Sequence, residues 1–315
     1  MKCTGLVRFL KYASIAFSWV DLPAPSKPSR TINILQNYIK KTLSVFYYFC
    51  FMNISFPAIM GVVNCTPDSF YAGSRAMDPA SALDRIANML QEGAAIVDIG
   101  ACSTRPGASW PSPAEEWNRL EPVLKLAKEN YPDILFSVDT FRPMIVEKAY
   151  SILGRFWVND IFAGNFDKAM LPLIASLDLP WIAMHQEPYQ GPRAITLFFQ
   201  KVSEAADRYG VREFILDPGF GFKKDVDQNF EVLSSLHSLV PRNEKGEPCA
   251  PLLAGISRKR MTYLPLGTTP ENALISTSAL HLQLLLKGVS ILRVHDVAHA
   301  VQMITLYKKM SIFEH

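Results

Sequence analysis

Short apolar runs alternate with longer segments of helical spacing from residue 57 to the end of the chain. Eight runs are rich in β-branched residues, and we expect a strand in each: 58–63, 94–99, 134–138, 156–158, 180–184, 213–216, 251–256 and 289–292. Apolar residues at helical spacing predict helices over 80–93, 114–130, 143–153, 194–209, 270–287 and 298–310. Strands that read as nearly continuous apolar runs are buried on both faces, which is typical of a parallel sheet.

The number of these units distinguishes between two parallel-sheet architectures. Eight strand–helix units in about 260 residues match the TIM (β/α)8 barrel in count and length. An open, doubly wound sheet is the alternative, and it normally has fewer units. We therefore predict an α/β fold, a single-domain TIM barrel over residues 52–315.

Hydrogen-bonding or ionisable side chains mark the ends of the eight runs. They are Asn64, Asp98, Asp139, Asn159 with Asp160, His185, Asp217, residues 257–259 and residues 293–296. In a barrel these positions meet at the carboxyl-terminal rim, where the active sites of this fold lie. Aspartate and asparagine also cap helices and form turns, but Lys259, Arg293 and His295 are not capping residues. We expect a polar site at this rim.

The segment "LDPGFGFKKD" (216–225) places Asp217 before a glycine-rich turn. Its spacing is neither that of a dinucleotide-binding fingerprint nor that of a Walker loop. A carboxylate there suits a ligand that offers two adjacent N–H donors.

Basic residues gather after the seventh and eighth runs. The segments "GISRKRM" (255–261) and "RVHD" (293–296) bring arginine, lysine and histidine to neighbouring strand ends, which form the usual phosphate corner of this fold. Together with the amide of Asn64 across the barrel seam, they suit a pyrophosphate with Mg²⁺.

Two loops carry further polar side chains. One follows the first run in "GVVNCTPDSF" (61–70), and the other is "DIGACSTRPGAS" (98–109) with Thr104 and Arg105. An arginine on a rim loop can hold a carboxylate by bidentate hydrogen bonds. The alternative is an ordinary solvated loop arginine.

Composition and charge exclude several classes of protein. Hydrophobic residues make up 49% and charged residues 19% of 315, which excludes a disordered, collagenous or disulfide-framework protein. Residues 1–51 hold seven of the 32 basic residues and one of the 29 acidic residues, so the rest of the chain carries a net charge of −3. The acidic body argues against a nucleic-acid binder.

The basic first fifty residues resemble a signal or transit peptide only in part. Their apolar runs are too short to span a bilayer, which needs about 20 residues. We expect residues 1–51 to be a poorly ordered extension or an upstream translation, with Met52 as the start, and targeting is the alternative. The five cysteines lack paired spacing, which is typical of reduced thiols in a cytoplasmic protein.

Seven strings, in this order and at these intervals, resemble the dihydropteroate synthase family of pterin-binding TIM barrels. They are "NCTPDSF", "STRPGA", "VDT", "ND", "DPGFGF", "SRK" and "RVHDV". The resemblance covers about residues 57–310. The chain departs from the family pattern at Cys65, Ala101, Cys102 and Lys223 and in "AMHQEPYQGP" (183–192).

The resemblance implies a reaction and residue roles. The family joins the amine of p-aminobenzoate to 6-hydroxymethyl-7,8-dihydropterin diphosphate, releases pyrophosphate, uses Mg²⁺ and forms homodimers. Asp98, Asp139 and Lys259 would be catalytic. The pterin pocket would contain Asp98, Asp139, Asn159, Met184, Asp217, Phe222 and Lys259. The p-aminobenzoate site would contain Asp68, Phe70, Thr104, Arg105, Pro106 and Ser257. Asn64, Arg293 and His295 would bind pyrophosphate, and Asn64 would also bind the metal.

Two other classes stay open at this point. A corrinoid-linked methyltetrahydrofolate methyltransferase shares the pterin-pocket carboxylates but should lack "NCTPDSF", "STRPG" and "SRK". A non-catalytic pterin-binding paralogue should have lost loop residues such as Asp68 and Arg105, which are present here.

Overall fold

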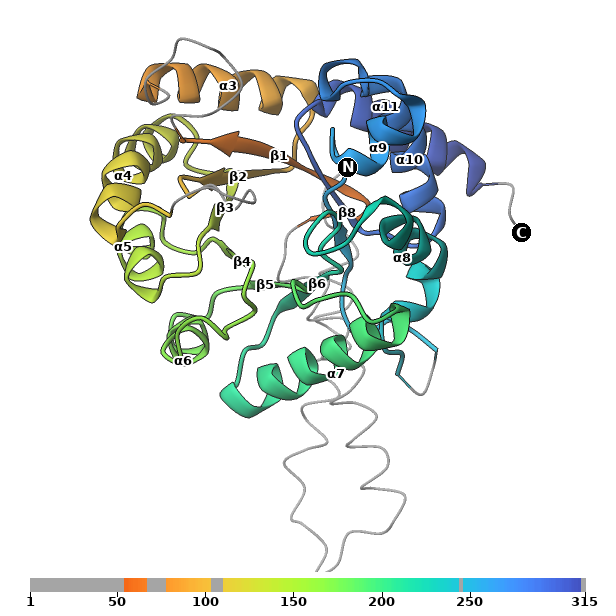
Figure 1. Cartoon of the computed structure of the whole chain (residues 1–315). Helices are drawn as coiled ribbons and strands as arrows, with labels where there is room; N and C mark the ends of the chain where they lie inside the picture. Colours follow the sequence, from red (N-terminus) through yellow and green to blue (C-terminus); the bar gives the residue numbers. More distant parts are fainter. Residues whose placement is uncertain (1–53, 67–77, 103–109, 244–245, 313–315) are drawn as a thin grey trace, which may run out of the picture. The chain divides into compact units, whose positions relative to one another are not determined.

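Eight parallel strands form a nearly closed barrel in the computed structural model, which describes residues 54–66, 78–102, 110–243 and 246–312 (Figure 1). Their order in the described part is β6-β5-β4-β3-β2-β1-β8-β7. A parallel bridge between Leu216 and Leu252 joins the two edges, and the Leu216 N–H donates to the Pro251 carbonyl at 3.0 Å. The predicted TIM barrel is confirmed.

Each of the eight predicted runs contains a strand. The strands are β1 Ala58–Asn64, β2 Ile96–Gly100, β3 Leu135–Asp139, β4 Trp157–Asp160, β5 Trp181–Met184, β6 Phe214–Asp217, β7 Leu253–Ala254 and β8 Ile291–Val294. The seventh strand is only two residues long, although its apolar run covers six. Asp98 and Arg293 lie inside their strands rather than after them.

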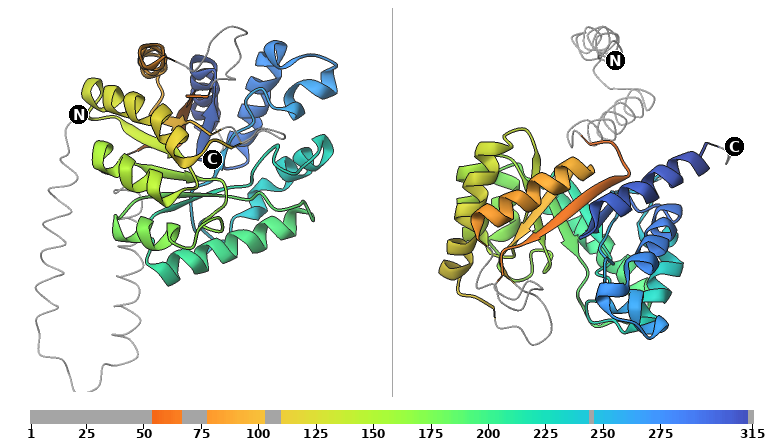
Figure 2. Two further views of the ribbon diagram at one scale, coloured as in Figure 1. Left: turned by 60° about the vertical axis from the view of Figure 1, so that its left-hand side comes forward. Right: turned by 90° about the horizontal axis from the view of Figure 1, so that it is seen from above.

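Helices lie outside the ring of strands in all three views (Figures 1 and 2). They are α3 Pro79–Glu92, α4 Pro113–Asn130, α5 Pro143–Leu153, α6 Met170–Ser176, α7 Pro192–Tyr209, α8 Val226–Leu239, α9 Arg260–Tyr263, α10 Leu274–Leu286 and α11 Val297–Met310. Two 3-10 turns cover Leu264–Leu266 and Pro270–Asn272. The predicted helix over 270–287 therefore begins later, and α6, α8 and α9 were not predicted.

Local sequence signals set the starts of the helices. Proline occupies the first turn of α3, α4, α5 and α7, where its missing N–H costs no hydrogen bond. Capping boxes begin α4 and α8: Ser112 pairs with Glu115, and Asp225 pairs with Gln228. The Asp225 cap starts α8 directly after the glycine-rich turn. The turn therefore lies between the end of β6 and the start of α8.

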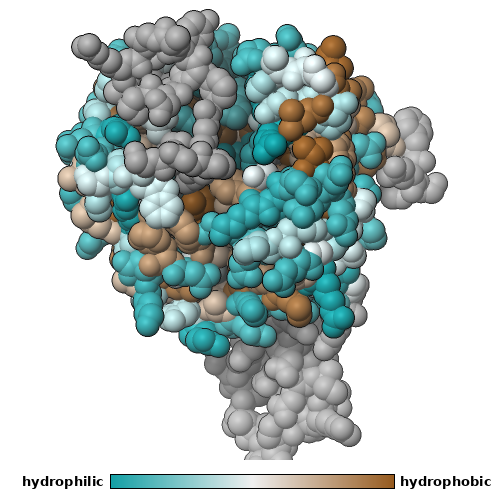
Figure 3. All heavy atoms as spheres, in the orientation of Figure 1, coloured by the Kyte–Doolittle hydropathy of each residue, from teal (hydrophilic) through white to brown (hydrophobic). Residues whose placement is uncertain are grey.

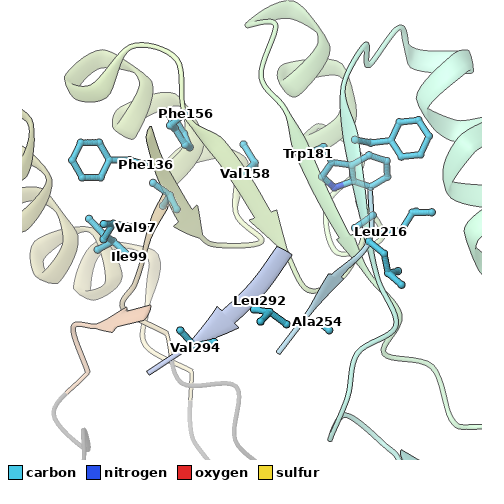
Figure 4. Packing of buried hydrophobic residues seen from close by; sticks show 14 of the residues in the cluster. Val97, Ile99, Phe136, Phe156, Val158, Trp181, Leu216, Ala254, Leu292 and Val294 are labelled. Atoms are coloured by element: carbon cyan, nitrogen blue, oxygen red, sulfur yellow. The ribbon is translucent and has the colours of Figure 1, made fainter. Parts of the chain in front are cut away.

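The main apolar core lies between the strands and the helices (Figure 4). Val97, Phe136, Trp181 and Leu292 belong to it, and each is at most 2% exposed. Because side chains alternate across a strand, the neighbours of these residues face the barrel interior. Asp98 and Arg293 are such neighbours, which is why the strands deliver polar groups to the inside of the barrel.

Contacts divide the chain into two compact units, and the barrel belongs to the unit over Ser55–His315. The predicted extension over 1–51 lies outside the described residues and stays a prediction. Among the described residues, no helix has the length and apolar character to cross a membrane.

Candidate active site

Arg293 on β8 joins two carboxylates across the mouth of the barrel. Its Nε donates to Asp98 Oδ2 at 2.7 Å, and its Nη2 donates to Asp139 Oδ2 at 2.9 Å. Asn159 Nδ2 donates to the same Asp98 oxygen at 3.1 Å. Strands β2, β3, β4 and β8 thus contribute to one hydrogen-bonded cluster, which brings these four predicted site residues together.

The second carboxylate oxygen of Asp98 is buried in the site. Asp98 is fully buried, and its Oδ1 makes no hydrogen bond within the described part of the chain. An unsatisfied buried acceptor costs about 1–3 kcal/mol, and more when it is charged. The site therefore holds a buried acceptor that an N–H donor of a ligand would satisfy.

The charges in this cluster shift one another's protonation. Burial raises the pKa of Asp139 to about 7, the Arg293 guanidinium opposes that rise, and the Asp98 carboxylate adds to it. Burial also favours a lower pKa for Arg293, but Asp98 and Asp139 outweigh burial and hold the pKa of Arg293 above its usual value. Arg293 is thus a permanent cation beside a carboxyl group that titrates near neutrality.

Asp217 and Lys259 approach from β6 and from the segment after β7. Asp217 Oδ1 accepts from the Gly219 N–H at 2.7 Å, and Lys259 Nζ donates to the Phe220 carbonyl at 2.6 Å. Burial raises the pKa of Asp217, and Lys259 opposes it. Burial lowers the pKa of Lys259 to about 8, and the Asp217 carboxylate opposes that shift.

The glycine-rich turn allows this approach. Gly219 has a φ of +66°, and a Cβ there would lie 1.9 Å from the His185 carbonyl oxygen. At Gly221, φ is +78° and a Cβ would lie 3.0 Å from Lys259 Cδ. Larger residues would therefore push the turn away from β5 and from the Lys259 side chain.

Lys224 supports the same turn, although no sequence pattern predicts this role. Its Nζ lies 3.2 Å from His185 Nδ1 and donates to the Gly219 carbonyl at 3.1 Å and the Phe222 carbonyl at 3.2 Å. Burial lowers the pKa of Lys224 to about 8 and that of His185 to about 4. The neutral imidazole therefore accepts from the lysine, and together they brace the turn.

An apolar wall lies beside the polar cluster. Met184, Phe141 and Ile161 are buried together, and Phe222 packs against them. The Lys259 ammonium lies 4.9 Å from the centre of the Phe222 ring. Met184 and Phe222, both expected to face the ligand ring, are thus in one cluster beside Lys259.

Ser257 and His295 form the corner between β7 and β8. Ser257 Oγ accepts from the His295 backbone N–H at 3.2 Å and lies 3.2 Å from Nδ1. The pKa of His295 is lowered to about 4, mainly by burial and further by Arg293 and Arg85. At neutral pH His295 is therefore an uncharged donor rather than a cation.

Five of the predicted site residues lie outside the described part of the chain. Asp68 and Phe70 fall in segment 67–77, and Thr104, Arg105 and Pro106 fall in segment 103–109, both outside the described residues. Hydrogen bonds hold the backbone on both sides of the second segment. Arg119 donates to the Ala101 carbonyl at 3.3 Å, and Arg142 donates to the Pro111 carbonyl at 2.7 Å and pairs with the buried Glu116.

The chain is a member of the pterin binding enzymes, whose family model matches residues 60–295. A dihydropteroate synthase of Streptococcus pyogenes is 40% identical over 248 residues, which cover 76% of this chain and 90% of that protein. The Xanthomonas albilineans dihydropteroate synthase structure with 4-aminobenzoic acid has a TM-score of 0.73 at 34% identity and covers 81% of this chain and 93% of that one. The same enzyme with 7,8-dihydropteroate has a TM-score of 0.70 at 32% identity, covering 81% and 94%.

The chain belongs to the dihydropteroate synthase family, which consists of transferases of folate biosynthesis. The resemblance drawn from the seven strings is therefore confirmed.

Proposed function

We propose that this chain condenses 6-hydroxymethyl-7,8-dihydropterin diphosphate with p-aminobenzoate to give 7,8-dihydropteroate and pyrophosphate. The observation that carries the proposal is the mouth of the barrel. Buried carboxylates of Asp98 and Asp217 lie in one mouth with Lys259 and the apolar wall of Met184 and Phe222. That combination suits a flat ring with N–H donors and carbonyl acceptors on its edge.

The pterin ring would be held by groups of matched polarity. The unpartnered Oδ1 of Asp98 and the carboxylate of Asp217 would accept from ring N–H groups. Asn159 and Lys259 would donate to ring acceptors, and Met184 and Phe222 would pack on the ring face. A hydrogen bond from the ligand to a buried polar group matters for binding, because that group is shielded from water.

The reaction needs no protein nucleophile. The amine nitrogen attacks the pterin methylene, a C–N bond forms, the C–O bond to the diphosphate breaks, and the electron pair leaves with the diphosphate. The amine proton passes to solvent. An ionised Asp139 would stabilise the electron-poor methylene, and preorganised donors would stabilise the charge that develops on the leaving group.

The leaving group would bind at the corner of β1, β7 and β8. Arg293 Nη1 makes no hydrogen bond within the described residues, so it is available to a diphosphate oxygen. His295 would donate one N–H as a neutral ring, because its pKa is lowered to about 4 mainly by burial.

The residues present fit a magnesium ion only when it is bound together with the diphosphate. No group of three acidic, histidine or cysteine side chains suited to a metal occurs among the described residues. Mg²⁺ commonly binds through one or two protein oxygens plus substrate phosphates, and Asn64, which ends β1, offers one amide oxygen. Asn64 would hold the ion, which would neutralise charge on the departing diphosphate.

The p-aminobenzoate would bind between the two loops. Asp68 and Phe70 would come from the first loop, Thr104, Arg105 and Pro106 from the second, and Ser257 would lie near the carboxylate. Exclusion of water by these loops would align the amine for attack. The support is the loop sequences, which match the family strings.

The proposal also includes a homodimeric assembly and a cytoplasmic location for this chain. Apolar side chains gather on the surface over the α9–α10 region (Figure 3), where Ile275 is 85% exposed and Leu266 is 65% exposed. An apolar patch of this kind favours a second copy as its cover. Cys65, Cys102 and Cys249 are free thiols in the structure, which is typical of a reducing compartment.

The adjacent lysines provide a sharp test of the pterin site. Lys259→Ala removes a half-buried ammonium from the mouth, whereas Lys223→Ala removes an exposed one from the neighbouring glycine-rich turn. We expect Lys259→Ala to weaken pterin binding in calorimetry and to reduce dihydropteroate formation, and Lys223→Ala to leave both near wild type. Equal pterin affinity in all three proteins would contradict the assignment of Lys259.

A further inference from the structure

A groove of about 330 Å³ lies along α3 and reaches the rim site at His295. One face of the helix provides its lining, namely Ser81, Asp84, Arg85, Asn88, Met89 and Glu92. His295 is therefore shared between this groove and the corner assigned above to the leaving diphosphate. The groove extends that corner away from the barrel axis and toward α3.

Arg85 brings a cation into the groove, and its buried Nε has no hydrogen-bond partner among the described residues. Burial lowers the pKa of Arg85, and the Asp296 carboxylate opposes that shift. A buried donor that makes no hydrogen bond costs about 1–3 kcal/mol, so an acceptor on a bound ligand would stabilise this nitrogen.

Two carboxylates near Arg85 accept hydrogen bonds from other groups. Arg258 Nε donates to Asp296 Oδ2 at 2.8 Å, and Arg258 Nη2 donates to Oδ1 at 2.8 Å. Glu92 Oε2 accepts from the Ala298 N–H at 3.2 Å. Asp84, which lines the groove together with Glu92, is exposed to solvent. The Arg85 guanidinium is thus available to bind an anion.

His295 complements this cation at the end of the groove. Ser257 Oγ accepts from the His295 backbone N–H, so its own proton can go to Nδ1, 3.2 Å away. The imidazole then carries its proton on Nε2. A guanidinium fork and one imidazole N–H suit the oxygens of a phosphate.

We infer that Arg85 is a binding residue for the terminal phosphate of the diphosphate, both in the pterin substrate and in released pyrophosphate. The inference rests on the proposed function, because that reaction supplies the diphosphate. Arg85 then acts beside His295, at the opposite end of the leaving group from the pterin pocket. Arg85 would therefore contact the phosphate end of the substrate and make no contact with the pterin ring.

The test separates the two ends of the substrate. Calorimetry measures the affinity for inorganic pyrophosphate with Mg²⁺ and, separately, for 6-hydroxymethyl-7,8-dihydropterin without its diphosphate. We expect Arg85→Ala to weaken pyrophosphate about tenfold or more, as for the loss of a charge-assisted contact, while the affinity for the free pterin stays within about twofold. Arg85→Lys keeps the charge but loses the fork, and its pyrophosphate affinity should be intermediate.

Two controls distinguish binding from folding. Arg208→Ala removes one exposed arginine at the end of α7 and should bind both ligands like wild type. Because Arg85 Nε makes no hydrogen bond among the described residues, Arg85→Ala should melt no lower than wild type. Unchanged pyrophosphate affinity in Arg85→Ala, or an equal loss for both ligands, would overturn the inference. A wild-type protein that bound neither ligand would instead overturn the proposed function, and the role of Arg85 with it.

Discussion

Replacing Asp98 with asparagine isolates what one buried carboxylate contributes to pterin binding. Asp98 Oδ2 accepts from Arg293 at 2.7 Å and from Asn159 at 3.1 Å, whereas Oδ1 is buried without a partner in the described part. Asparagine keeps the shape of the side chain but replaces one acceptor with a donor and removes the negative charge. If the amide oxygen stays with Arg293, the NH₂ group faces the N–H donor of the pterin.

The expected magnitude follows from that single contact. A hydrogen bond to a charged acceptor contributes about 1.5–3 kcal/mol, which corresponds to a loss of about 10- to 150-fold in pterin affinity. The fold should persist, because Arg293 keeps Asp139 as a counter-ion at 2.9 Å. Thermal melting checks this point before any binding is compared.

Calorimetric titration with the pterin substrate is the assay. Asp207→Asn is the matched control, since Asp207 is an exposed aspartate on α7 and the same change there should leave pterin affinity unaltered. A folded Asp98→Asn protein that bound the pterin as tightly as wild type would refute the reasoning. It would mean that the free Oδ1 does not meet a donor of the ligand.

Three further predictions concern proton state, the second loop and the start of the chain. Because burial raises the pKa of Asp139 to about 7 and the anion stabilises the methylene, kcat should rise from about pH 6 to about pH 8; a flat profile would contradict that role. Arg105→Ala should mainly raise the KM for p-aminobenzoate, and an effect confined to the pterin substrate would count against it. A chain that starts at Met52 should keep full activity, and a failure to fold would show that residues 1–51 are needed.

The sequence predicted the barrel well because its signal is repeated eight times. Each apolar run is bounded by polar residues, and a boundary error of two residues does not change the architecture. The shortest strand, Leu253–Ala254, was overestimated, since an apolar run cannot show where strand pairing ends. The capping box of Asp225 and Gln228 marks the start of α8 within the sequence itself.

The site was harder to predict because its interactions connect distant strands. Asp98 was expected at a strand end but lies inside β2, where its side chain meets Arg293, 195 residues away. The ion pairs of Arg293 with two carboxylates depend on the order of strands around the barrel, which composition and spacing do not contain. Lys224 and Arg85 look like ordinary solvated residues in the sequence. Only the structure shows that Lys224 braces a turn by hydrogen bonds and that Arg85 Nε is buried without a hydrogen bond among the described residues.

The most direct test of the proposed reaction is to measure both products in one mixture. The full chain is incubated with the pterin diphosphate, p-aminobenzoate and Mg²⁺, and dihydropteroate and pyrophosphate are quantified together. We predict equal amounts of the two products, and neither of them when p-aminobenzoate is left out. Pyrophosphate release without p-aminobenzoate, or the absence of dihydropteroate from the complete mixture, would contradict the account.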